Sequence, residues 1–245
     1  MNLATLLGAS LATLLLLALL YRRHALRRSR QQGRALLQAL MHSLEMLQRL
    51  QKHRGLGGQD SAAARAQCRL LADELDRLWR ELPPAAGELE ELLPAWQRLR
   101  SQADDFDGHC RLIEQLLTAM QLFELRQGED IEIARRCREL EELARLRGLA
   151  VRGAGAPRCP LPLQVQLRYL SLRLQRQAAP HSALAQALER LQRQLIEPLR
   201  VAIAPQECFE LLTPLIDEQL GTLRQRLLAA ADPAIRPPMH HEPAR

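Results

Sequence analysis

Three cationic side chains stand in a row where a Leu-rich segment meets a glycine-rich stretch. The segment Leu47–Gly58 reads LQRLQKHRGLGG, with Lys52, His53 and Arg54 directly before Gly55. Arginine offers planar, paired donors to a planar oxyanion, and glycines let backbone N–H groups approach an anion. The segment is therefore a candidate anion site, although the GxxxxGK[ST] order of a phosphate loop is absent. Cations at a helix end also complement the helix dipole, and this simpler explanation stays open.

A second segment further along the chain repeats the arrangement. Glu141–Gly155 reads EELARLRGLAVRGAG and contains the pairs Arg147-Gly148 and Arg152-Gly153. Two such elements on separate helices could face each other across a helical bundle. A buried arginine without a counter-charge is costly, so each would need a carboxylate or an anionic ligand. Four nearby acidic side chains could supply the carboxylate: Glu132, Glu139, Glu141 and Glu142.

No pattern typical of an enzyme or a metal site accompanies these arginines. GxSxG, HExxH and paired-carboxylate arrangements are missing from the sequence. His240-His241 and His109-Cys110 are adjacent pairs, but neither has further ligands at metal spacing. The five cysteines form no CxxC pair and suit a reducing compartment. We therefore predict a protein that is not an enzyme and holds neither a metal nor a cofactor.

Leu-rich stripes with steps of three and four residues predict the helices that would position the arginines. They run over Leu37–Leu47, Leu71–Leu82, Leu112–Phe123, Leu163–Leu174, Leu184–Leu195 and Leu212–Leu227. Glycine and proline breaks separate them, the widest being Arg152–Pro162. No stretch alternates as a strand would. The predicted fold class is all-α, with about seven or eight mostly antiparallel helices in one or two four-helix bundles, preceded by one transmembrane helix.

The predicted transmembrane helix is Leu3–Leu20, a run of 18 residues without a charge. As a helix it would span about 27 Å, close to the thickness of a bilayer's hydrocarbon core. A cleaved signal peptide would instead have basic residues before the run and a small-x-small site after it. The sequence has neither feature, and Tyr-Arg-Arg follows the run. We therefore predict an uncleaved single-span anchor.

The basic excess of the chain is concentrated behind this anchor. Tyr21–Arg30 contains five arginines and no acid, and it accounts for five of the six net positive charges. An almost neutral remainder does not indicate a nucleic-acid-binding surface. Because cytoplasmic flanks carry the Lys/Arg excess, the body should lie in the cytoplasm. The predicted divisions are an anchor at 1–21, a basic juxtamembrane segment at 22–33, a helical domain at 34–230 and a disordered tail at 231–245.

Three segments resemble the bacterial nitrate- and nitrite-sensing domain family. Gln51–Gly58, QKHRGLGG, resembles the family signature, roughly Leu-Gln-x-Glu-Arg-Gly-x-Ser, with histidine in place of glutamate at position 53. Cys137–Arg152, CRELEELARLRGLAVR, resembles a later helix that carries the family's second arginine, which would be Arg147. Phe106–Leu117, FDGHCRLIEQLL, is similar to the middle helix of the family. The resemblance covers about residues 34–230.

The resemblance implies two packed four-helix bundles that bind nitrate or nitrite between helices. Arg54 and Arg147 would contact the anion, with Lys52, His53 and Arg152 as further ligand-binding candidates. The family usually carries an output module, whereas only a short tail follows the last stripe here. We therefore expect signalling through a separate partner protein, and a homodimer is compatible with this arrangement. The alternative is a membrane-tethered helical scaffold or interaction module without a small-molecule ligand. The predicted location is the bacterial inner membrane.

Overall fold

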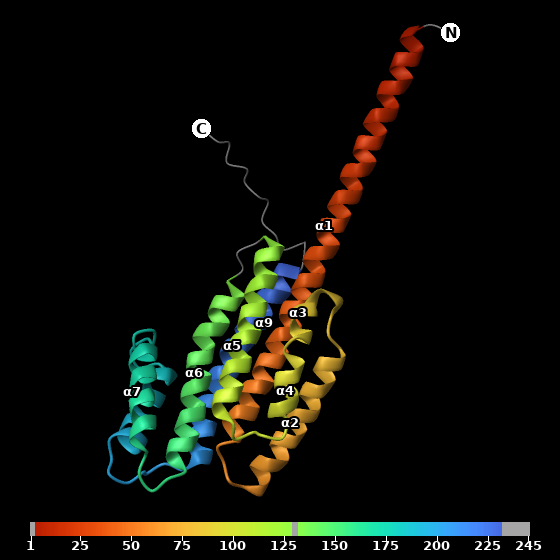
Figure 1. The fold of residues 1–245 in the computed structure, drawn as a ribbon. Helices are drawn as coiled ribbons and strands as arrows, with labels where there is room; N and C mark the ends of the chain where they lie inside the picture. The colour runs from red at the N-terminus through yellow and green to blue at the C-terminus, as the bar shows by residue number, and fades with distance from the viewer. Residues whose placement is uncertain (1–2, 129–131, 232–245) are drawn as a thin grey trace.

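The computed structural model describes residues 3–128 and 132–231, with side chains from residue 16 onward (Figure 1). Helices and their connections make up this part of the chain, and no strand occurs in it, which confirms the all-α fold class. Nine α-helices occur within these residues: α1 (Leu3–Leu56), α2 (Ala62–Arg80), α3 (Gly87–Glu90), α4 (Leu93–Leu99), α5 (Phe106–Gln127), α6 (Ile133–Ala154), α7 (Leu161–Gln175), α8 (Ala183–Leu191) and α9 (Pro205–Ala231). A 3-10 turn at Pro84–Ala86 and a π-helical turn at Gln192–Ile196 complete the elements.

Capping side chains set the beginnings of three helices. The side chains of Ser61, Asp105 and Ser182 accept hydrogen bonds from backbone N–H groups in the first turns of α2, α5 and α8. These contacts satisfy donors that have no partner inside the helix. Gly128 ends α5 with a φ of 74°, a left-handed conformation that costs glycine little.

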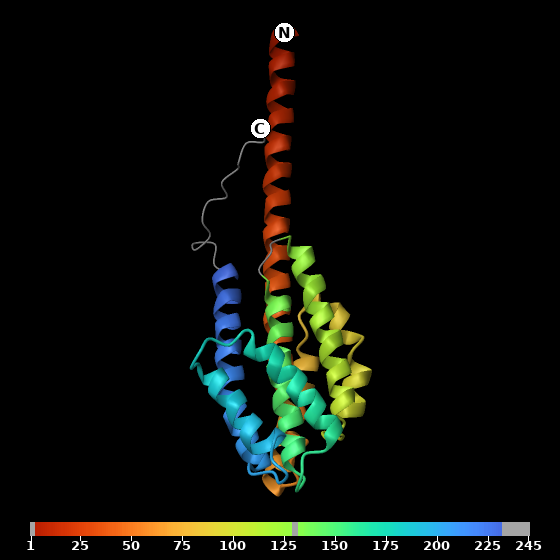
Figure 2. The same cartoon turned by 90° about the vertical axis from the view of Figure 1, so that its left-hand side faces the viewer.

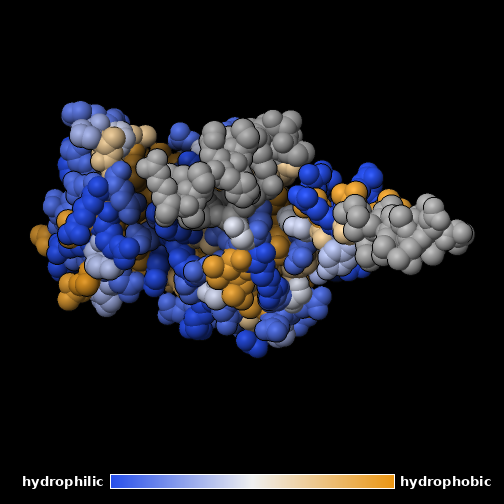
Figure 3. Space-filling view, turned by 90° about the horizontal axis from the view of Figure 1, so that it is seen from above, coloured by the Kyte–Doolittle hydropathy of each residue, from blue (hydrophilic) through white to orange (hydrophobic). Residues whose placement is uncertain are grey.

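Four long helices form the centre of the body. The lower part of α1 and α6 run in one direction, whereas α5 and α9 run in the opposite one (Figures 1 and 2). Helices α2 to α4 cover the α1–α5 side, and α7 and α8 pack against α6 and α9. The Leu-rich stripes meet in one large apolar core, except that Leu71 lies in a smaller separate cluster with Leu56, Ala64 and Cys68. Figure 3 shows a largely hydrophilic surface around this core, with hydrophobic side chains gathered at a few places.

The first helix is much longer than the sequence divisions suggested. Residues 3–56 form one continuous helix, whose first half projects from the body (Figure 1). The predicted anchor, basic segment and first body helix therefore lie on one helix, and from residue 16 onward the first buried side chain is that of Leu36. Among the helical residues with described side chains, none offers a stretch long and apolar enough to cross a membrane. The anchor predicted at Leu3–Leu20 falls largely on residues 1–15, whose side chains lie outside this description.

The number of helices is close to the prediction, whereas one break between helices is shorter than predicted. The body contains the lower part of α1 and eight further α-helices within the described ranges, one of them four residues long, which is close to the predicted seven or eight. The break predicted at Arg152–Pro162 is shorter, because α6 continues to Ala154. Gly153 faces a close neighbour, since a Cβ there would lie 2.9 Å from Sγ of Cys159. The predicted tail at 231–245 lies outside the described residues except for Ala231, which ends α9.

Candidate anion-binding site

The two Arg-Gly elements meet where the last turns of α1 lie against α6. Arg54 and Arg147 are both fully buried. Gly55 makes room for Arg147 of the opposite element, whereas Gly148 makes room for Phe106 of α5. A Cβ on Gly55 would lie 3.1 Å from Nε of Arg147. A Cβ on Gly148 would lie 2.7 Å from Cε2 of Phe106, whose ring lies below the Arg54 guanidinium. The glycines therefore permit close side-chain packing between helices, and Gly148 lies inside α6 rather than at its end.

Arg54 has a carboxylate partner. Glu141 binds it with two hydrogen bonds, Nη1 to Oε1 at 2.5 Å and Nη2 to Oε2 at 3.1 Å. Nη1 also donates to Sγ of Cys110 at 3.2 Å, and the guanidinium lies 5.2 Å from the ring centroid of Phe106. Burial alone would lower the pKa of Arg54, but the charges and hydrogen bonds of Glu141 and Cys110 together outweigh it, and the pKa is raised. Of the four carboxylates that the sequence offered, Glu141 is therefore the partner of this arginine.

Arg147 lacks such a partner. Its Nη1 donates to Oγ1 of Thr213 at 2.9 Å, and its Nη2 donates to the backbone carbonyl of Gln51 at 2.8 Å. The guanidinium lies 4.7 Å from the ring centroid of Phe209. Within the described ranges, no carboxylate lies close enough to form an ion pair with it. Burial, followed by the nearby charge of Arg54, lowers the pKa of Arg147 to about 9.

Arg152 completes the cluster from the next turns of α6. It donates hydrogen bonds to the backbone carbonyls of Arg54 at 3.2 Å, Gly148 at 3.3 Å and Asp104 at 3.1 Å. Its guanidinium lies 4.6 Å from the ring centroid of Phe106, which Arg54 also contacts. Burial, followed by the charge of Arg54, lowers the pKa of Arg152. Arg54, Arg147 and Arg152, which we call the arginine cluster, thus share one side-chain carboxylate, Glu141, within 4 Å among the described residues.

Gln51 connects the two fully buried arginines, and sequence reasoning did not select it as a site residue. Its Nε2 donates to Oε2 of Glu141 at 3.0 Å, while its backbone carbonyl accepts from Arg147. Its Oε1 has no hydrogen-bond partner, and neither does Nε of Arg54 or Nε of Arg147, although all three atoms are buried. The signal that could have found Gln51 is its spacing, because residues three and four apart share a helix face with Arg54 and Gly55.

Lys52 and His53 lie outside the arginine cluster. Lys52 pairs with Asp217 of α9 at 3.2 Å. His53 contacts His109, with Nδ1 and Nε2 2.8 Å apart, and makes an edge-on contact with Trp96. Successive helical residues point about 100° apart, so three consecutive side chains cannot converge on one small ion. Lys52, His53 and Arg54 therefore point into three different environments.

The two histidines form a buried neutral pair. His109 Nδ1 lies 2.6 Å from the backbone carbonyl of Asp105, which can only accept. Nδ1 of His109 must therefore carry the proton, and its Nε2 accepts from Nδ1–H of His53. Burial, followed by the charge interaction with His109, lowers the pKa of His53 to about 3. Burial is also the main cause that lowers the pKa of His109 to about 4.

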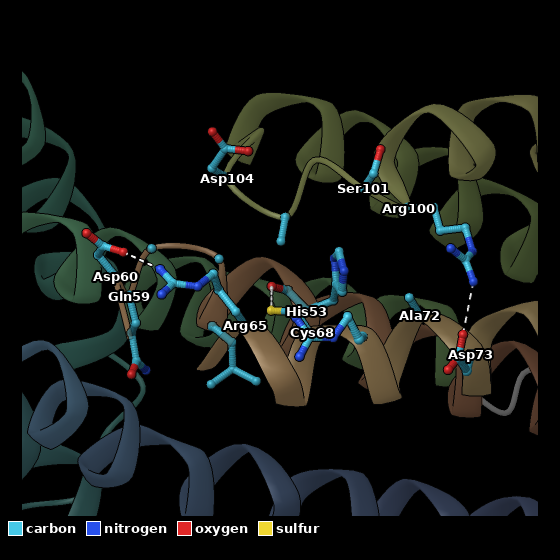
Figure 4. A pocket seen from close by; sticks show the side chains of 15 residues that line it. His53, Gln59, Asp60, Arg65, Cys68, Ala72, Asp73, Arg100, Ser101 and Asp104 are labelled. Atoms are coloured by element: carbon cyan, nitrogen blue, oxygen red, sulfur yellow. Dashed lines mark hydrogen bonds and ion pairs between the residues drawn. The ribbon is translucent and has the colours of Figure 1, made fainter. Parts of the chain in front are cut away.

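A cavity of about 870 Å³ lies on the other side of His53, between α1, α2 and the loop before α5 (Figure 4). Three arginines and three aspartates are among the residues that line it. Arg65 pairs with Asp60 at 2.5 Å, and Arg100 pairs with Asp73 at 2.9 Å. Because its charges are balanced in this way, the cavity is a poorer anion site than the arginine cluster.

The arginine cluster combines an excess of buried positive charge with donors that lack partners. This combination suits a small anion that accepts several hydrogen bonds at once. Comparisons with protein-family models, curated proteins and solved structures find no match for this chain.

Proposed function

We propose that this chain is a membrane-anchored sensor that binds a small oxyanion, nitrate or nitrite, at Arg54 and Arg147. The observation that carries the proposal is Arg147, a fully buried guanidinium that has neutral hydrogen-bond partners and lies beside a second buried arginine. A buried charge without a counter-ion is expensive, so the folded chain retains it at a cost that a bound anion would offset.

The size and charge of nitrate fit this environment. Nitrate is planar and singly charged, and it accepts hydrogen bonds at three oxygens. One hydrogen bond to a charged group contributes only about 1.5–3 kcal/mol, so a useful site needs several converging donors. The Nε–H groups of Arg54 and Arg147 still lack acceptors and would be the first donors available. An anion between them would offset the repulsion between the two guanidinium groups and draw α1 towards α6.

Glu141 limits where an anion could bind in the arginine cluster. Its carboxylate already occupies the paired Nη donors of Arg54, where a planar oxyanion would otherwise bind. We therefore place the incoming anion on the Nε side of the two arginines. Arg152 would stabilise the backbone around the site through its bonds to the carbonyls of Arg54 and Gly148.

The membrane placement is part of the same proposal. The uncharged run Leu3–Leu20 would cross the inner membrane of a bacterial cell once, and the arginines of Tyr21–Arg30 would hold the body in the cytoplasm. Protease treatment of intact cells and of inverted vesicles tests the orientation. The body should be digested only in inverted vesicles, and digestion from outside intact cells would overturn it.

A scaffold without a small-molecule ligand is the second candidate function. The observation in its favour is the ion pair between Arg54 and Glu141, because an arginine with a partner has less need of an external anion. In this case the arginine cluster would serve only to fix α1 against α6.

Calorimetry of the full chain in lipid nanodiscs separates the two functions. Nitrate or nitrite should bind with heat that chloride does not produce, and Arg147→Gln and Arg54→Gln should each abolish that heat without loss of helical circular dichroism. Arg138→Gln is the matched control, since Arg138 lies on the same helix with a side chain that is 35% exposed. Normal nitrate binding by both variants would refute the site. No selective heat in the unchanged protein would favour the scaffold.

A further inference from the structure

Helix α7 has two apolar faces, of which the body covers only one. Leu167, Leu170 and Leu174 point into the core. On the opposite side lie four large apolar residues that are 58–69% exposed: Leu161, Val165, Tyr169 and Leu172. Their spacing of four, four and three residues places them on one stripe, which we call the outer face of α7. A helix that packs on one side normally turns polar residues outwards, so this face has no partner among the described residues.

The outer face continues into a groove. A cavity of about 350 Å³ lies between α7 and α8, and Leu172 contributes to its lining together with Ser171, Leu188 and Gln192. The hydroxyl of Ser171 is buried there without a hydrogen-bond partner. The surface therefore offers an apolar ridge, a neighbouring hollow and one free polar group.

The charges along α7 are positive, and the groove beside it is lined by Arg168 and one acid, Glu189 of α8. The sequence from residue 143 to residue 188 contains seven arginines and no acid. Arg168 and Arg176 are exposed on or just after α7. Arg173 lies over the ring of Tyr169 at 5.7 Å and already forms an ion pair with Glu142 of α6. An apolar stripe flanked by arginines is complementary to a helix with an apolar stripe flanked by acids.

We infer that the outer face of α7 and its groove bind one amphipathic helix of a partner protein, with acidic residues beside its apolar stripe. The 15 residues of α7 span about 22 Å, which corresponds to about four turns of such a helix. A second copy of this chain fits less well, because two α7 helices would bring arginine against arginine. A lipid surface also fits less well, because α7 stands roughly along the body rather than across its end (Figure 1). The inference is independent of anion binding.

A designed peptide provides the probe. It is an 18-residue fluorescent helix with leucines at steps of three and four residues and glutamates beside them. Fluorescence anisotropy with the full chain in zwitterionic nanodiscs should show binding at least tenfold tighter than for a scrambled peptide or for a peptide with lysines in place of the glutamates. Equal binding of the acidic and lysine peptides would overturn the inference.

Substitutions locate the binding surface. Val165→Glu with Leu172→Glu should weaken peptide binding at least tenfold, and Arg168→Glu should weaken it several-fold. Leu125→Glu is the matched control, because Leu125 is 70% exposed on α5. Helical circular dichroism should stay unchanged in each variant. An unaffected affinity in the Val165→Glu, Leu172→Glu variant would refute the site.

The same variants also test whether a second copy of this chain or a membrane binds the outer face of α7. Light scattering that shows a dimer lost on Val165→Glu would assign the face to a second copy. Binding to vesicles with anionic lipid that is lost on the same substitution would assign it to a membrane. Either result would overturn the partner-helix inference.

Discussion

The ion pair between Arg54 and Glu141 allows a quantitative test of how the arginine cluster is held. Glu141→Gln keeps the size of the side chain but removes its charge and replaces one acceptor oxygen by a donor NH₂ group. Arg54 is completely buried and the side chain of Glu141 is only 12% exposed, so solvent cannot replace the lost partner. Removing one partner of a buried ion pair costs about 3–5 kcal/mol. For a chain of this size, that loss corresponds to a fall in Tm of roughly 6–20 °C.

Thermal unfolding of the full chain in nanodiscs, followed by circular dichroism, measures this loss. Glu139→Gln is the matched control on the same helix, because Glu139 is 42% exposed in a surface pair worth about 0–1 kcal/mol. The control should melt within about 3 °C of the unchanged protein. A Glu141→Gln variant that melted as high as the control would refute the reasoning that Arg54 depends on this carboxylate.

If an anion can also occupy the site, nitrate should restore part of the stability of Glu141→Gln. At a concentration 100 times its Kd, a ligand that binds only the folded state stabilises it by about 2.7 kcal/mol. Chloride at the same ionic strength is the control for screening. Equal effects of nitrate and chloride would contradict specific binding but would leave the ion-pair prediction intact.

Two further predictions concern the neighbours of the cluster. Burial lowers the pKa values of His53 and His109 to about 3 and about 4. Below pH 6.5 the unfolded chain therefore binds more protons than the folded chain. The free energy of unfolding should fall by up to about 1.4 kcal/mol per pH unit for each histidine as the pH is lowered. Urea unfolding between pH 4.5 and 8 should show this slope, and a slope that survived replacement of both histidines by glutamine would contradict it. Gly148→Ala should cost about 1–3 kcal/mol because its Cβ would meet Phe106 at 2.7 Å, whereas Gly221→Ala, with no atom within 4 Å, should be neutral or stabilising. Equal unfolding midpoints for the two glycine variants would show that Gly148 is not closely packed.

The sequence was informative about the helices and about which arginines would come together. The Leu-rich stripes became core faces, since a spacing of three and four residues leaves a helix only one way to bury them. Arg54 and Arg147 meet at the crossing of α1 and α6, as the two Arg-Gly elements suggested. Their identification as anion ligands stays a prediction.

Other features depended on contacts between distant residues. Gly153 falls in the break predicted at Arg152–Pro162, yet it lies inside α6, where Cys159 occupies the space that a side chain on Gly153 would need. Four carboxylates were candidates for Arg54, and the choice of Glu141 depends on the rotation of α6 against α1, which no local pattern encodes.

The continuous helix α1 connects the arginine cluster to a segment that projects far from the body. Its 54 residues extend for about 81 Å, and Arg54 lies near one end, two residues before the last residue, Leu56. A rotation of this rod by about 5° around Arg54 would carry its far tip through about 7 Å on that length. Because α1 is packed into the core from Leu36 onward, such a rotation would also shift the core residues of α1 before it reached the projecting half.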